Sequence, residues 1–241
     1  MSIRQLMDYC FRLYGRRNRL FFWGTIDRVV FLNIAVGDLQ DAIRKGKSKT
    51  VIGDMLGRIV SRVFCVTEAF KSLPLVEVMA RKYPLSHCTY CGRLPCRCRE
   101  RRPDYKLLET AASEQMEWSL REWCSGFQAL YGKQNEKRDV EVLINRLFKE
   151  VVELFSVQAR VETIEGSLSY IEEEIALELA DVLAWTIALA NFYKIDLEKC
   201  FLARYGKGCV RCGKSDECVC TSFRRGQLDW YRYVAASRIV Q

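Results

Sequence analysis

YPLSHCTYCGRLPCRC, residues 83–98, returns in diverged form as YGKGCVRCGKSDECVC, residues 205–220. Each stretch reads CxxCG, then a short polar loop, then CxC, which is spacing typical of a tetrahedral zinc site. The glycine after the second cysteine permits the tight turn that folds the loop over a metal. We call the two stretches the first and the second knuckle. Their expected zinc ligands are Cys88, Cys91, Cys96 and Cys98 in the first, and Cys209, Cys212, Cys218 and Cys220 in the second.

The expected role of both zinc ions is structural, because protein fills all four ligand positions and leaves none open for chemistry. The alternative is that these cysteines are free or disulfide-bonded. His87 adjoins Cys88 and is either a substitute ligand or a bystander. Clustered cysteines in a chain with long apolar helices and no recognisable leader favour a cytoplasmic metal-binding protein over a secreted disulfide scaffold.

The similarity between the two halves extends upstream of the knuckles. LYGRRN at 13–18 matches LYGKQN at 130–135, and FLNIAVGDLQDA at 31–42 aligns with LINRLFKEVVEL at 143–154. Matched landmarks in the same order indicate an internal duplication. The chain is therefore predicted to be a tandem repeat.

The periodicity within the repeats is helical. Apolar residues recur at helical spacing over 140–160, and a second apolar helix is expected to run to about residue 193. We therefore predict an all-α fold of two helical-bundle units, at 1–105 and 106–241, each ending in its knuckle. The two units are expected to pack against each other as an intramolecular pseudo-dimer.

Charge is distributed unevenly along the chain, whose formal net charge is +8. Residues 1–108 carry 21 basic and 9 acidic side chains, whereas residues 109–241 carry 17 and 21. The basic half, including the arginines that flank the first knuckle, is suited either to nucleic acid phosphates or simply to solvent. The apolar stretch 175–192 is interrupted by two carboxylates, which argues against a membrane span.

Four carboxylates in the second repeat form the pattern with the clearest chemistry. Glu150 and Glu153 are three residues apart and share one helix face, and Glu178 and Asp181 repeat that spacing on the next helix. The second pair lies in IALELADVLAWTIALA, a segment so apolar that it should be buried. A buried carboxylate needs a cation, and no lysine or arginine occurs between residues 171 and 193. If the helices pack antiparallel, the four oxygen ligands would suit Mg²⁺ or Mn²⁺.

KEVVELF followed by LELADVLAW resembles the paired acidic motifs, ExxE and ExxD, of the MazG-like nucleoside triphosphate pyrophosphohydrolases. ANFYKIDLEK and the CxxCG…CxC tail extend the resemblance. It implies an all-helical, Mg²⁺-dependent enzyme that cleaves a nucleoside triphosphate to the monophosphate and pyrophosphate, and it commonly implies a homo-oligomer. The resemblance makes Glu150, Glu153, Glu178 and Asp181 the magnesium ligands and catalytic residues. Lys149 stands where the family often has a further glutamate, so the number of bound metals stays open.

Substrate contacts are expected from polar residues around the acidic motifs. Lys149 and Lys194 are candidates for phosphate, although the sequence favours ordinary surface charge for both. Asn135 and Asn191 resemble positions near the family's nucleotide pocket.

The first repeat has lost half of this pattern. The alignment places Asp38 on Glu150 and Asp41 on Glu153, but it places Leu56 and Ile59 on the other two acids. Two carboxylates cannot form the same site, so the first repeat is predicted to be catalytically silent. It is expected to close the pocket through Arg44, Lys45 or Lys47.

A second function class stays open beside the pyrophosphohydrolase. In it the protein is a non-catalytic, zinc-containing binding module, whose basic N-terminal half holds nucleic acid or a protein partner.

Overall fold

The computed structural model describes residues 1–22, 24–70, 73–98, 113–161 and 168–220. Within these ranges the chain forms eight α-helices and one short 3-10 helix, with no β-strand. The first repeat contributes α1 (Ile3–Phe21), α2 (Thr25–Arg44), α3 (Lys49–Thr67) and α4 (Leu75–Lys82). The second contributes η1 (Ser113–Glu117), α5 (Leu120–Asn135), α6 (Val140–Val161), α7 (Leu168–Phe192) and α8 (Leu197–Tyr205). The all-α prediction is confirmed, while the boundary expected near residue 105 lies outside the described residues.

Equivalent serines start the first helix of each repeat. Ser2 and Ser119 each form a capping box, in which the serine hydroxyl accepts a hydrogen bond from the third helical N–H and that residue's side chain accepts one from the serine N–H. The same two serines pair as an isolated antiparallel bridge. Contact between equivalent residues is what an approximate two-fold axis produces, so the repeats face each other as the halves of a symmetric dimer do.

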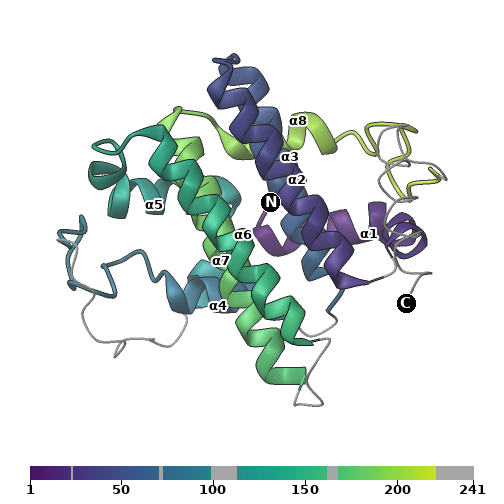
Figure 1. Ribbon diagram of the computed structural model, residues 1–241, viewed down its shortest axis with the longest axis horizontal. Helices are drawn as coiled ribbons and strands as arrows, with labels where there is room; N and C mark the ends of the chain where they lie inside the picture. The colour runs from purple at the N-terminus through teal and green to yellow at the C-terminus, as the bar shows by residue number, and fades with distance from the viewer. Residues whose placement is uncertain (23, 71–72, 99–112, 162–167, 221–241) are drawn as a thin grey trace.

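The repeats exchange helices across this axis. The pairs α2–α3 and α6–α7 each pack within one repeat, but α4 of the first repeat packs on α7, and α8 of the second packs on α3 (Figure 1). Gly53 lets α8 approach α3 closely, since a Cβ there would lie 2.6 Å from the Cys200 Sγ atom. One continuous hydrophobic core runs from Ile3 to Cys218 as a result.

Each knuckle likewise contacts the other repeat. The Cys96 N–H of the first knuckle donates to the Leu130 carbonyl of α5 at 2.9 Å, and the Cys218 N–H of the second donates to the Leu13 carbonyl of α1 at 2.7 Å. Leu13 and Leu130 are the matched leucines of the repeat. Each knuckle therefore fastens its own repeat to the first helix of the other.

Helix α7 is the central helix of the second repeat. Its segment Ile171–Phe192 is long and apolar enough to cross a membrane, but 67% of its most apolar window is buried inside the protein. Its neighbours α4, α5 and α6 cover it. This burial is what a core helix requires, and it leaves Glu178 and Asp181 of α7 partly buried.

Candidate functional site

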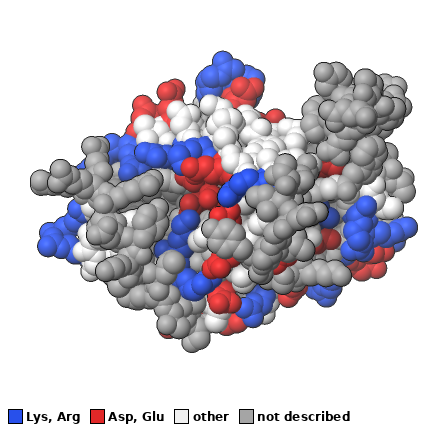
Figure 2. All heavy atoms as spheres, turned by 60° about the horizontal axis from the view of Figure 1, so that its bottom comes forward, with Lys and Arg blue, Asp and Glu red and all other residues white. Residues whose placement is uncertain are grey.

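Antiparallel packing of α6 on α7 gathers acidic side chains from both helices. Carboxylate oxygens of Glu150, Glu153 and Glu178 all lie within 4.8 Å of one another, a spacing that could hold a metal ion. We call these three residues the acidic trio. Acidic side chains gather near the middle of the face seen in Figure 2, with lysines and arginines on either side.

Burial leaves the trio short of compensating charge. Glu150 is only 7% exposed, and burial, together with a hydrogen bond to Glu153 and the charge of Asp181, raises its pKa to about 8. Burial, followed by repulsion from Asp181, raises the pKa of Glu178 to about 7. The Glu178 Oε2 atom is buried without a hydrogen-bond partner among the described residues. A divalent cation would satisfy that oxygen and the surplus negative charge together.

Asp181 lies beside the trio but is neutralised differently. It forms an ion pair with the Lys82 Nζ atom at 2.7 Å and accepts a hydrogen bond from the Tyr83 hydroxyl. Burial and the charge of Asp181 raise the pKa of Tyr83, so this phenol stays protonated and donates. The lysine that neutralises Asp181 does not come from the segment 171–193, because the exchanged helix α4 brings it from the other repeat.

Sequence reasoning missed Lys82 and Tyr83 as parts of this site. Lys82 also donates to the Leu177 carbonyl at 3.3 Å, which fixes the end of α4 on α7. The internal repeat could have indicated these two residues, since a basic residue followed by tyrosine, Arg204 and Tyr205, occupies the matching positions at the end of α8. The matching arginine pairs with Asp54 of α3, so both repeats clasp their partner with a basic residue at this point.

Of the four expected substrate contacts, only Lys149 touches the trio. Its ammonium group binds Glu153, and this hydrogen bond lowers the pKa of Glu153. Asn191 instead donates to the Cys124 carbonyl of α5 at 2.9 Å, which is a packing role. Lys194 is exposed in the turn after α7, roughly 20 Å along the helix axis from Asp181. Asn135 is the last residue of α5 and accepts the Arg138 N–H at 3.0 Å.

The first repeat has no matching acidic trio among its described residues. Leu56 and Ile59 are fully buried in the core at the two apolar positions. Asp38 forms an ion pair with Arg58 at 3.0 Å. Asp41 is exposed and pairs with the residues expected to close the pocket, Arg44 at 3.1 Å and Lys45 at 2.8 Å. The first repeat instead contributes Lys82 and Tyr83, at the end of α4, to Asp181 beside the trio.

Both knuckles hold four cysteines in a metal-binding arrangement. None of the twelve cysteines forms a disulfide, so a disulfide pairing of the clusters is wrong in this structure. Five sulfur–sulfur separations within the clusters lie between 3.3 and 4.0 Å, and the four sulfurs of each cluster all lie within 4.8 Å of one another. Tetrahedral zinc with Zn–S bonds of about 2.3 Å requires separations of about 3.8 Å. Each cluster could therefore hold a zinc ion, and His87 is not part of the first one.

Backbone donors favour the thiolate form of one cysteine in each knuckle, whereas burial raises the pKa of Cys96, Cys98, Cys218 and Cys220. A hydrogen bond from the Lys214 N–H lowers the pKa of Cys212 to about 6. At Cys91, desolvation raises the pKa of the thiol. Hydrogen bonds from the Arg97 and Arg93 N–H groups lower it by more, so the pKa of Cys91 is about 6. Thiolate is the form that binds zinc, so these donors favour a metal at neutral pH.

Comparison with known proteins adds no relative, since no family model, curated protein or solved structure matches the chain.

The raised pKa values of Glu150 and Glu178 predict how stability depends on pH. Both carboxyls start from 4.5 and rise to about 8 and about 7 in the fold, so the folded chain keeps protons that the unfolded chain releases. Without added divalent ions, stability should fall as pH rises from about 4.5 to about 8. Thermal unfolding across this range, for the protein and for Glu150→Gln, checks the effect. The variant should show a clearly weaker dependence, and an unchanged slope would contradict these shifts.

Proposed function

We propose that the acidic trio binds Mg²⁺ and that the protein is a nucleotide pyrophosphohydrolase, cleaving nucleoside triphosphates to the monophosphate and pyrophosphate. The observation that carries this is the unpartnered Glu178 Oε2 atom within a group of three converging carboxylates. Three converging, partly buried carboxylates destabilise a fold unless a cation binds them. The resemblance of the two acidic motifs to those of MazG-like enzymes supports the same function.

The chain's own residues have separable tasks in this proposal. The trio holds the ion through oxygen ligands, which suits a hard cation. When bound, Mg²⁺ supplies charge neutralisation for the triphosphate and activation of water. Lys82 and Tyr83 fix the orientation of Asp181 beside the trio, and Lys149 at the exposed rim provides a cation for phosphate oxygens. The two knuckles hold structural zinc, which fastens the exchanged helices in place.

A pyrophosphate-release assay over common and damaged nucleotides, with and without Mg²⁺, tests the proposal. We expect release that depends on Mg²⁺ or Mn²⁺. The repeat supplies a matched control, because Asp38→Asn and Asp41→Asn alter the acids at the equivalent positions of the first repeat and should leave the rate unchanged. Absence of release from every nucleotide would overturn the proposal.

Lys82 is expected to act as a positioning residue for Asp181. Replacing it with alanine should lower kcat by about ten- to a hundredfold while leaving KM within a few-fold, because its Nζ atom contacts the carboxylate and not the solvent-exposed rim. Lys82→Arg should restore part of the rate. Arg204→Ala removes the equivalent clasp of the other repeat and serves as the control with unchanged activity. A rise in KM alone would show that Lys82 binds substrate directly.

A further inference from the structure

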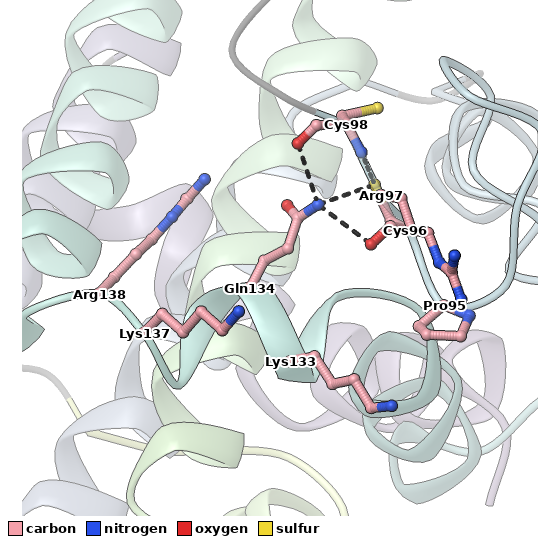
Figure 3. A pocket seen from close by; sticks show the side chains of 8 residues that line it. All are labelled: Pro95, Cys96, Arg97, Cys98, Lys133, Gln134, Lys137 and Arg138. Atoms are coloured by element: carbon pink, nitrogen blue, oxygen red, sulfur yellow. Dashed lines mark hydrogen bonds between the residues drawn. The ribbon is translucent and has the colours of Figure 1, made fainter.

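A hollow of about 480 Å³ opens between the first knuckle and the C-terminal end of α5 (Figure 3). Both repeats form it, because Arg97 comes from the knuckle while Lys133, Lys137 and Arg138 come from the end of α5 and the turn that follows. Gln134 fixes the two sides together by donating to the Cys96 carbonyl at 3.2 Å and to the Cys98 carbonyl at 3.4 Å. The lining has four basic side chains and no acidic one.

Three of these four basic side chains have no acidic partner in the described part of the chain. Among the described residues, Arg97, Lys133 and Lys137 form no ion pair with a carboxylate within 4.0 Å, and all three are exposed. Arg138 lies over the indole ring of Trp185 with its guanidinium carbon 5.7 Å from the ring centroid. Cys96 and Cys98 also line the hollow, but the four basic side chains exceed the net charge of −2 that a zinc ion with four thiolates would carry, so this concave surface favours an anionic ligand.

The second knuckle packs on α1 without the basic surface that the first knuckle forms with α5. In the aligned sequences Glu217 replaces Pro95 and Val219 replaces Arg97. Arg16, which matches Lys133, lies 4.0 Å from the Glu217 carboxylate and is partly neutralised by it. Both knuckles dock through the same backbone hydrogen bond, although the second has Val219 in place of Arg97 and an acidic partner beside Arg16. The basic residues therefore serve something other than folding.

An aromatic side chain accompanies the charge. Tyr90 lies between two zinc ligands of the first knuckle and is 43% exposed, whereas the second knuckle has Arg211 at that position. Trp185 of α7, which is partly exposed, contacts Arg138 and so adds a second ring next to a lining residue of the hollow. Cationic grooves flanked by aromatic rings are how proteins bind single strands, with phosphates on the cations and bases stacked on the rings.

We propose that this hollow binds a few nucleotides of single-stranded nucleic acid, with backbone phosphates at Arg97, Lys133 and Lys137 and a base stacked on Tyr90. The binding does not depend on hydrolysis at the acidic trio. Its volume suits one or two nucleotides rather than a duplex.

Fluorescence anisotropy with labelled single-stranded RNA and DNA 12-mers over a salt series tests this. Lys133→Glu with Lys137→Glu should weaken binding by at least about tenfold and reduce the salt dependence by about 0.7 for each phosphate that the variant no longer binds. The control is Lys207→Glu with Lys214→Glu, which makes the same charge change at exposed lysines near the second knuckle and should alter affinity by less than about twofold.

Tyr90→Ala separates stacking from charge. It should weaken binding by about five- to a hundredfold, while Tyr90→Phe should retain most of the affinity. Circular dichroism on each variant checks that the fold is intact. An equal fall in affinity for the two lysine pairs, competition by inorganic polyphosphate together with an unaffected Tyr90→Ala, or no binding at low salt would each overturn the proposal.

Discussion

Replacing Glu178 with glutamine should reduce pyrophosphate release by more than about a hundredfold, because it removes one of three converging metal ligands. The same change should stabilise the metal-free protein by about 1–2 kcal/mol above neutral pH. Glutamine carries no charge to desolvate, and its amide can donate to the neighbouring carboxylates of Glu150 and Glu153. A substitution that lowers activity but raises the free energy of unfolding is characteristic of a residue that serves function rather than folding.

Initial rates and thermal unfolding of Glu178→Gln should be measured side by side. Asp41→Asn is the control, because Asp41 occupies the position equivalent to Glu153 in the first repeat but is exposed and paired with Lys45. It should change neither quantity appreciably. Full activity in Glu178→Gln would remove the trio from the reaction, whatever the effect on stability.

Loss of the first knuckle's metal should have the largest effect on stability. Cys96→Ser removes a ligand and disturbs the segment that bonds to Leu130, so the exchanged helix α4 loses its anchor on the second repeat. Zinc binding to such sites is worth about 10 kcal/mol or more in small zinc modules, and even part of that would be large here. A loss of about 4 kcal/mol corresponds to a fall in Tm of roughly 10 °C for a chain of this size.

Metal analysis and thermal unfolding together check this expectation. The protein should carry two zinc ions per chain, and Cys96→Ser should carry one. Activity should fall with it, because α4 also delivers Lys82 and Tyr83 to Asp181. Cys200→Ser, a cysteine outside both clusters, should keep two zinc ions and nearly the original Tm. Unchanged zinc content or stability in Cys96→Ser would show that the cluster is not a structural metal site.

Much of the fold follows from local sequence patterns. Helical periodicity predicted a helix over 140–160, and α6 spans Val140–Val161. The two CxxCG…CxC stretches predicted the two four-cysteine clusters, because ligand spacing is a local property. The spacing of Glu150 and Glu153, with an antiparallel partner helix, predicted how carboxylates from α6 and α7 meet.

The exchange of helices between repeats could not be predicted in this way. Similarity between repeats identifies equivalent residues, but α4 can pack on its own repeat or on the other with the same apolar face. The absence of a cation near Asp181 in sequence was therefore misleading, since Lys82 lies 99 positions away. Asn191 illustrates the converse, because a polar residue near a motif turned out to bond to the backbone of α5.

Electron paramagnetic resonance of Mn²⁺ tests most directly whether the acidic trio holds a divalent ion. Titration of the zinc-loaded protein should show saturable binding of Mn²⁺, Mg²⁺ should compete, and Glu178→Gln should lose most of the bound signal while Asp38→Asn retains it. This readout needs no knowledge of the nucleotide. Equal Mn²⁺ binding by the protein and by Glu178→Gln, or none by either, would contradict the assignment of the trio as the metal centre.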